Sequence, residues 1–228
     1  MSSAARHARA HDLGRVLRVY RMARPLPSFV LELGIAAAIG LGIHLLSGLL
    51  LPAVGAGLLV LLLVEVLGDV RLVVCERGLL IGRLLPGCSP YRLRYSEIDP
   101  RGVACVRDVG RCARATGRSY GSTLFSPRGS RRGVLLDGPV AAAARTRSFS
   151  VASLFDTPPD TGRGGKIWAF AYAGRPEALI DLLGEAMLAA GRADAAALRE
   201  SALPERSVDE LVGLGGRSLP HARGPVRA

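Results

Sequence analysis

Lysine is almost absent from this chain of 228 residues, although the net charge is +11. Of the 30 basic residues only Lys166 is a lysine, and all the others are arginines. We attribute this bias partly to GC-rich coding DNA, which favours arginine codons. A single arginine therefore carries less functional weight here than it would in a lysine-rich chain.

Cysteine is scarce and lacks the spacing that metal sites need. The four cysteines are separated by 13, 17 and 7 residues, with no histidine near them in sequence: Cys75, Cys88, Cys105 and Cys112. A structural zinc site usually draws its ligands from close pairs. The sequence therefore predicts no metal and no cofactor. The membrane topology argued below places the thiols inside the cell, where we expect them to be reduced.

Catalytic motifs are lacking as well. A nucleophile needs a base within hydrogen-bond reach, and the chain beyond residue 69 has one histidine, His221, in a predicted flexible tail. The stretch before Lys166 imitates a phosphate-binding loop. However, G-x-x-x-x-G-K-[ST] would need glycine where Asp160 stands and Ser or Thr in place of Ile167. We predict that the protein is not an enzyme.

One long hydrophobic run dominates the first third of the chain. Residues 29–68 contain only three ionisable side chains, Glu32, His44 and Glu65. A bilayer crossing takes about 20 helical residues, so these 40 residues correspond to two crossings. Ser47-Gly48 and Pro52 interrupt the run in its middle. We therefore predict a transmembrane hairpin over 28–69, with helices at about 28–47 and 52–69.

The arginines predict the orientation of this hairpin. They precede the first predicted helix and follow the second, whereas the connecting turn is uncharged. Positive flanks stay on the cytoplasmic side, so we expect both termini in the cytoplasm and the protein in the inner (cytoplasmic) membrane. The alternatives are a cleaved signal peptide and a buried helical hairpin of a soluble protein.

Small residues recur every fourth position in both predicted helices. Such spacing lets helix backbones approach closely, so we expect these residues to pack the hairpin or to join copies of the protein. Glu32 and Glu65 should lie near the inner surface and His44 near the outer one. The small residues in question are Gly34, Ala38 and Gly42 in the first helix, and Ala53 and Gly57 in the second.

The N-terminal segment 1–27 is basic and amphipathic. Apolar residues stand at positions 13, 16, 17 and 20, and arginines at 15, 18 and 21. This spacing is typical of an amphipathic helix in the headgroup layer, over 12–21. A simple solvated, positively charged flank is the alternative interpretation.

Alternating and β-rich stretches follow the hairpin. We expect strands at about 70–75, 79–84, 92–98, 102–106, 133–136 and 166–172, the last around the single tryptophan. Proline at 176 and glycine at 191 bracket a predicted amphipathic helix. Because helices do not alternate with strands, the fold class is α+β with an antiparallel sheet. We place this cytoplasmic domain at 70–190 and a flexible tail at 191–228.

The order of these elements resembles that of the bacterial pleckstrin-homology-like (PH-like) membrane proteins. The likeness covers about 70–106 and 166–188 and rests on V-R-L-V-V-C-E-R-G-L-L-I-G-R-L-L-P, R-Y-S-E-I and R-P-E-A-L-I-D-L-L. It implies a small, strongly bent antiparallel β-barrel of seven strands, capped by a C-terminal α-helix. Residues 107–165 depart from the family pattern, and this leaves the strand count open.

That departing region is rich in arginine. Residues 101–147 contain ten arginines and two aspartates, a local charge of +8. Tyr120 and Phe125 are its only aromatic residues and it has no nucleic-acid-binding motif, so we expect no nucleic acid. The loops are either solvated or in contact with anionic lipid, and the pair Arg92 and Arg94 resembles the phosphate-contacting arginines of lipid-binding PH domains. The candidate lipid contacts are Arg92, Arg94, Arg111, Arg114, Arg118, Arg131 and Arg132.

These features favour a membrane-anchored adaptor or scaffold. In this hypothesis the hairpin presents the PH-like domain at the inner leaflet, where the domain binds protein partners, copies of itself or anionic lipid. The alternative is a small oligomeric transport or channel component built from the hairpin. A pore requires polar side chains at mid-membrane depth, and the middle of both predicted helices is apolar.

Overall fold

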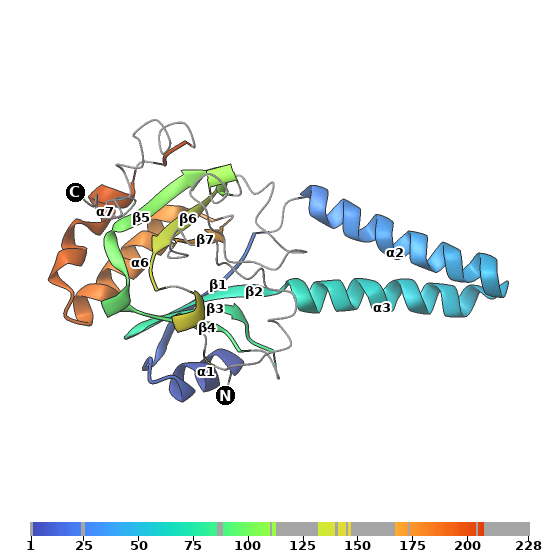
Figure 1. Cartoon of the computed structure of the whole chain (residues 1–228), viewed down its shortest axis with the longest axis horizontal. Coiled ribbons are helices and arrows are strands. Elements are labelled where there is room, and N and C mark those ends of the chain that lie inside the picture. The colour runs from blue at the N-terminus through green and yellow to red at the C-terminus, as the bar shows by residue number, and fades with distance from the viewer. Residues whose placement is uncertain are drawn as a thin grey trace, which may run out of the picture. The chain divides into compact units, whose positions relative to one another are not determined.

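The computed structural model describes residues 2–23, 26–85, 89–109, 111–112, 132–139, 141–144, 146, 167–172, 174–203 and 205–207. The chain divides into two compact units. Residues 24–69 form the first, called the helical pair below. Residues 1–23 and 70–228 form the second, called the two-sheet domain (Figure 1).

The helical pair consists of α2 (Leu26–Ser47) and α3 (Leu50–Gly68), which lie side by side and antiparallel (Figure 1). Both helices are confirmed to within two residues of their predicted ends. Pro52 lies in the first turn of α3. Proline is tolerated there because the first N–H groups of a helix have no intrahelical acceptor.

Three hydrogen bonds stabilise the short turn that joins the two helices. Gly48 has a φ of +66°, a left-handed conformation that glycine adopts without steric cost. Its N–H donates to the carbonyl of His44 at 2.8 Å. The Ser47 hydroxyl donates to the carbonyl of Ile43 at 2.8 Å and accepts the N–H of Leu49 at 3.2 Å.

Small residues form the contact between the two helices, but on α2 they are not the predicted ones. A Cβ added at Gly40 would lie 3.0 Å from the carbonyl oxygen of Ala53, and one added at Gly57 would lie 3.3 Å from that of Ala36. The prediction was correct for Ala53 and Gly57. Gly34, Ala38 and Gly42 do not lie at the contact between the helices, since Ala38 is exposed and the two glycines have no atom within 4 Å of an added Cβ. For these three residues a contact between copies of the protein stays a prediction.

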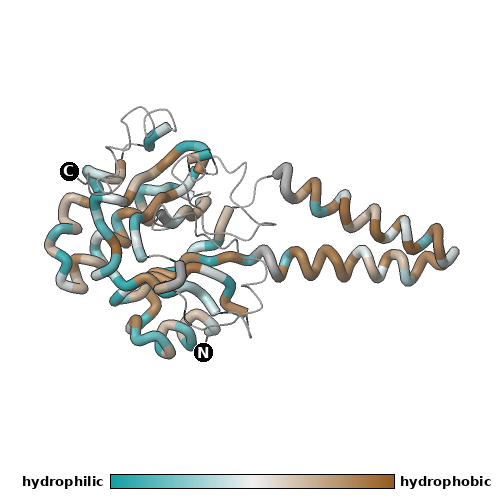
Figure 2. Tube along the Cα trace, in the orientation of Figure 1, coloured by the Kyte–Doolittle hydropathy of each residue, from teal (hydrophilic) through white to brown (hydrophobic). Residues whose placement is uncertain are grey.

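The helical pair is hydrophobic along most of its length (Figure 2), and many of its leucine, valine and isoleucine side chains are exposed. Within the described residues, one helix is long and apolar enough to cross a membrane, over Phe29–Ser47, with a mean hydropathy of 2.1. The apolar stretch of α3, Leu50–Val66, is shorter. A double crossing therefore stays a prediction.

The first sheet of the two-sheet domain has four antiparallel strands in the order β1-β2-β3-β4. Its central hairpin is the predicted pair of strands joined by the turn at Glu76 and Arg77. The sheet also contains a strand that the sequence did not predict, formed by the N-terminal segment. The strands are β1 (Val16–Arg21), β2 (Val70–Cys75), β3 (Gly78–Arg83) and β4 (Tyr91–Arg94).

Strand β1 shows that the amphipathic-helix interpretation of 12–21 was wrong. Tyr20 pairs with Leu72 of β2 and is buried in the core. The register shifts between Val16 and Arg18, which marks a β-bulge at Leu17. Because a bulge adds one residue to a strand, it interrupts the two-residue alternation that would have indicated a strand in the sequence.

The second sheet has three antiparallel strands in the order β5-β6-β7. All three contain predicted strands, including the one with Trp168. Seven strands are thus present in the described residues, and the seventh comes from the N-terminal segment and not from 107–165. A closed barrel is not established by these two sheets. The strands are β5 (Asp99–Arg107), β6 (Arg132–Asp137) and β7 (Ile167–Ala171).

Helix α6 (Pro176–Ala189) confirms the predicted C-terminal helix. Leu179, Ile180 and Leu183 of this helix share a core with the inner faces of both sheets. The chain stays packed beyond residue 190, which corrects the predicted end of the domain. Residues 195, 198 and 202 are buried in the same core, in a 3-10 turn (Ala193–Ala197) and α7 (Leu198–Ala202).

The outer face of the four-stranded sheet is covered by α1 (Ser3–Ala10). Ala4 and Ala8 of this helix join Leu13, Val73 and Leu80 in a separate apolar cluster. The N-terminal segment therefore contributes to the domain twice, as an edge strand and as a cover for one face. The remaining described elements are a 3-10 turn (Tyr95–Glu97) and the short α5 (Ala141–Ala144).

Candidate functional site: a charged groove at one end of the sheet

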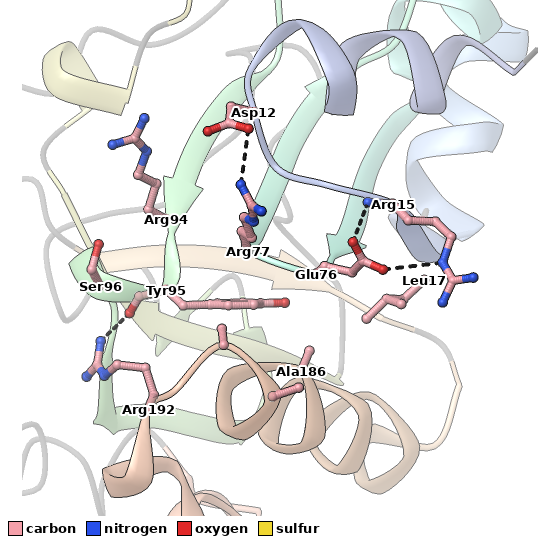
Figure 3. Close-up of a pocket in the computed structure, with 12 residues that line it drawn as sticks. Asp12, Arg15, Leu17, Glu76, Arg77, Arg94, Tyr95, Ser96, Ala186 and Arg192 are labelled. Carbon is pink, nitrogen blue, oxygen red and sulfur yellow. Dashed lines mark hydrogen bonds and ion pairs between the residues drawn. The ribbon is translucent and has the colours of Figure 1, made fainter.

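A groove of about 860 Å3 lies at one end of the four-stranded sheet. It is formed by the segment before β1, the β2–β3 turn, the end of β4 and the end of α6 (Figure 3). Four of its residues are arginines and two are carboxylates. The lining residues are Asp12, Arg15, Leu17, Glu76, Arg77, Arg94, Tyr95, Ser96, Ala186, Ala189, Ala190 and Arg192.

Strand register places this groove at the end of the sheet opposite its connections to α2 and α3. At the connected end, Arg21 is the partner of Arg71, and the N–H of Met22 donates to the carbonyl of Val70 at 2.9 Å. At the groove end, Val16 is the partner of Cys75. A strand rises about 3.3 Å per residue, so the length of β2 separates the two ends by about 17 Å.

The segment before β1 is held against the β2–β3 turn by backbone hydrogen bonds. The N–H of Glu76 donates to the carbonyl of Arg15 at 3.1 Å, and the N–H of Arg77 donates to that of Leu13 at 3.0 Å. Gly14 has a φ of +76°, and a Cβ added there would lie 2.6 Å from the Glu76 carboxylate. A residue with a side chain would be strained at this φ, so glycine favours the course of this wall of the groove.

Two ion pairs cross this wall (Figure 3). The Arg15 guanidinium lies 3.4 Å from Glu76, whose carboxylate also accepts the Arg15 backbone N–H at 2.9 Å. Arg77 lies 3.2 Å from Asp12. All four side chains are largely exposed. Exposed pairs of this kind contribute about 0–1 kcal/mol each, so they position charges more than they stabilise the fold.

Arg192 holds the other wall in place. Its guanidinium donates to the carbonyl of Tyr95 and to both carboxylate oxygens of Asp194, at 2.9 and 2.6 Å. The hydrogen bonds from Arg192 lower the pKa of Asp194 below its usual value. Arg192 thus links the end of α6 to the end of β4, and its charge is matched.

Tyr95 lies beneath the groove as a structural group. Its hydroxyl donates to the carbonyl of Cys75 at 2.7 Å. Burial raises the pKa of this phenol, so it remains protonated at neutral pH. Figure 3 shows the Arg77 and Arg94 side chains on one side of the Tyr95 ring and Ala186 on the other.

Arg94 differs from the other groove arginines. Its backbone N–H donates to the Glu97 carboxylate at 2.9 Å. Within the described part of the chain its guanidinium has no ion-pair or hydrogen-bond partner, and the side chain is exposed. Arg94 is therefore the groove cation that is available to a ligand.

The structure separates the predicted lipid-contacting arginines. Arg92 lies on the same face of β4 as Arg94 but is half-buried, with its Nε buried and without a hydrogen-bond partner. Arg132 lies on the second sheet, 3.2 Å from Glu205, and Arg111 follows β5. Hence only Arg94 lines the groove. Arg114, Arg118 and Arg131 lie outside the described residues.

The described thiols are buried and remain protonated at neutral pH. Burial raises the pKa of Cys75 and Cys105 to about 12 and that of Cys112 to about 11. A thiol needs its thiolate form to act as a nucleophile or metal ligand. In the described residues no group of three or more His, Cys, Asp or Glu side chains is placed to hold a metal ion.

Comparison with known proteins gave no relative from which a role could be transferred. No family model, no curated protein and no solved structure matches the chain.

Sequence reasoning singled out only one residue of this groove as a binding candidate, Arg94. The others that carry its charge come from three separate segments: Asp12 and Arg15, Glu76 and Arg77, and Arg192. The one local signal was the Glu-Arg-Gly turn after β2. Nothing in the sequence indicated that residues 12–15 would pair with that turn across the helical insertion.

Proposed function

We propose that this protein is an integral membrane adaptor. In this proposal α2 and α3 both cross the bilayer as a hairpin, and they anchor a PH-like domain at the cytoplasmic face of the inner membrane. There the domain binds protein partners, further copies of itself or anionic lipid. Both termini are cytoplasmic.

The observation that carries the proposal is the pairing of β1 with β2 around the helical pair. Met22 and Val70 share a backbone hydrogen bond of 2.9 Å, although α2 and α3 lie between them in the chain. A sheet cannot form across a bilayer, so this pairing supports a hairpin in which both ends of the helical insertion lie on the same side. In this proposal α3 returns the chain that α2 carries across.

The same pairing argues against a cleaved signal sequence. Cleavage after α2 would release β1 from the sheet, together with Tyr20 from the core. It would also release α1, which covers the outer face of that sheet. A signal peptide is dispensable for the mature fold, whereas this segment contributes to two apolar clusters.

The surface of the helical pair supports a lipid environment. Leu46 and Leu51 are 91% and 87% exposed, whereas Ala36 and Ala53 are almost completely buried. Exposing leucine to water is unfavourable by about 25 cal/mol per Å2 of apolar area. In lipid the same exposure costs little, and small residues at the interface allow close helix packing.

The PH-like assignment rests on the order of the elements. After the helical pair, the strands β2 to β4, the three-stranded sheet and α6 follow one another in the chain, in the order that the resemblance implies. Strand β1, which precedes the helical pair, is an addition to that order. In this proposal the two sheets close into a bent barrel, with the helical pair inserted between its first and second strands.

Topology mapping with two tags tests the proposal. Protease-cleavable tags are placed at the N-terminus and the C-terminus of the full chain, which is then expressed in bacterial membranes. We expect the chain to resist alkaline extraction, and both tags to be cleaved in inside-out vesicles and protected in right-side-out ones. Tags on opposite sides, or a chain that alkali releases, would overturn the proposal.

The alternative is an oligomeric transport or channel component, and it has less support. Leu33, Ala36 and Leu58 are among the apolar residues that line the cavity between α2 and α3, and among the described side chains that line it only His44 is ionisable. A pore needs polar groups at mid-membrane depth. Glu32 and Glu65 both lie near the same end of the antiparallel pair.

A further inference from the structure

We propose that the groove binds an extended, acidic segment of a protein partner, with Arg94 as the main contact for its carboxylates. This inference rests on the membrane-anchored adaptor proposed above and names the chemistry of its partner. It assigns Arg94 to a protein ligand in place of the lipid headgroup that the sequence suggested.

Charge is the first argument. Arg15 and Arg77 are each paired with a carboxylate of the groove, and Arg192 is paired with Asp194. Arg94 remains without an acidic partner among the described residues. A carboxylate placed beside it would gain a charge-assisted hydrogen bond and would leave no cation unmatched.

The shape and composition of the groove favour a peptide over a small anion. Its volume of about 860 Å3 is far larger than an inorganic anion requires. Leu17 is 37% exposed at its rim, and Ala189 and Ala190 are exposed beside it. A ligand that fills this space offers apolar side chains as well as carboxylates, as an acidic peptide does.

The groove end of strand β1 provides an edge for an extended ligand. Within the described residues the one strand neighbour of β1 is β2, and Leu17 of β1 lines the groove. The main-chain groups of Arg15 are already bonded to Glu76, and beyond the other end of β1 the N–H of Ala23 donates to the carbonyl of Ala171 at 2.9 Å. An extended peptide can add to an exposed sheet edge through main-chain hydrogen bonds, while pockets select alternate side chains. A peptide with acidic and apolar residues in alternation fits this arrangement.

Binding of defined peptide pools to the full chain tests the proposal. The protein is reconstituted in nanodiscs of neutral phosphatidylcholine and titrated into fluorescein-labelled octapeptides that alternate Glu with Leu or Val. A matched pool carries Lys in place of Glu. We expect the acidic pool to bind, the lysine pool not to bind, and added salt to weaken binding because the contact is exposed.

Three variants locate the binding. Arg94→Ala should weaken it about twofold to fivefold, the range expected for loss of one exposed ion pair. Glu76→Gln should strengthen it, because it frees the charge of Arg15 while an amide oxygen can still accept the Arg15 N–H. Arg175→Ala is the matched control, since this exposed arginine directly precedes the other end of α6 and makes no capping hydrogen bond with its side chain, about 20 Å away along the helix.

Every other outcome overturns the proposal. No binding of the acidic pool up to about 1 mM, the weakest affinity of interest here, excludes a peptide site. An equal loss with Arg175→Ala indicates general attraction to a basic protein. Arg94-dependent binding to added anionic vesicles, without peptide binding, assigns the site to lipid. Failure of the chain to enter nanodiscs refutes the membrane anchor instead, so the two failures are distinguishable.

Discussion

In the two-sheet domain Leu79, Leu80 and Leu93 are fully buried, whereas in the helical pair Leu46 and Leu51 are almost fully exposed. The helical pair buries its small residues, such as Ala36 and Ala53. One chain therefore follows two packing rules. The domain gains stability by removing leucine from water, and the helical pair gains contact where backbones approach closely.

The largest effect we expect is the loss of a domain leucine. Leu93→Ala removes a side chain that is 0% exposed in the shared core, and such changes cost about 2–5 kcal/mol. Leu46→Ala in the helical pair should leave the domain unchanged, within about 0.5 kcal/mol. Urea unfolding followed by Trp168 fluorescence measures both, because this tryptophan belongs to the same core.

Equal effects of the two substitutions would contradict the comparison. Leu188→Ala serves as a second control, because Leu188 is a domain leucine that is 45% exposed on α6. It should behave like Leu46→Ala. That result would show that the loss of unfolding free energy depends on how buried the leucine is, and not on the unit to which it belongs.

The next largest effect is expected when a substitution introduces a charge on the exposed surface of one unit or the other, and it is an effect on membrane retention. Leu59 lies in the middle of α3 and is exposed. If that surface faces lipid, Leu59→Arg costs about 2.5–3.5 kcal/mol and lowers the fraction of the chain that resists alkaline extraction. Leu188→Arg places the same charge on an exposed helix of the domain and should leave membrane retention unchanged. Equal membrane retention of both variants would contradict the interpretation that the helical pair lies in the membrane.

A smaller effect is expected at the close contact between α2 and α3. Gly40→Leu places a side chain against the Ala53 carbonyl, and such overpacking costs about 1–3 kcal/mol. Gly34→Leu is the control, since nothing lies within 4 Å of a Cβ there. Electron-resonance distances between spin labels at positions 30 and 63 should lengthen or broaden for the first variant alone. Identical distributions would show that Gly40 is not at the contact.

The two units also differ in how well the sequence predicted them. Helices α2 and α3 could be placed to within two residues because their signal is local: an uninterrupted apolar run with a break at Ser47-Gly48. The glycines at their contact could not be chosen, since Gly34, Gly40 and Gly42 all stand in the same helix. Which of these glycines contacts α3 depends on how each helix is rotated about its own axis. That rotation is set by the packing of the two helices against each other and not by a local sequence pattern.

In the two-sheet domain, local strands were predictable and distant pairing was not. The β2–β3 hairpin and the strand with Trp168 have strong local patterns. Strand β1 was missed because arginines at 15, 18 and 21 follow a helical spacing, and because its partner β2 lies beyond the whole helical insertion. The groove could not be predicted for the same reason, because its charged walls come from segments that meet only through the β1–β2 pairing.

The smallest effect concerns the cysteines, which occur in the two-sheet domain and not in residues 24–69. Burial raises the pKa of Cys105 from 9.0 to about 12. Below pH 9 the thiol is protonated in both the folded and unfolded states, so stability does not depend on it. Between pH 9 and 12 only the unfolded state loses the proton, so stability falls as pH rises.

At pH 10 this difference costs about 1.4 kcal/mol for one thiol. Cys105→Ala should therefore unfold in urea with a weaker dependence on pH between 8 and 10 than the unchanged chain. Cys75→Ala should act in the same way, since burial raises the pKa of that thiol to a similar value. The helical pair has no thiol, so the spin-label distance between α2 and α3 should not change over this range. If the spin-label distance changed with pH in parallel with the stability of the two-sheet domain, the two units would unfold together. Their different packing would then not make their stabilities independent.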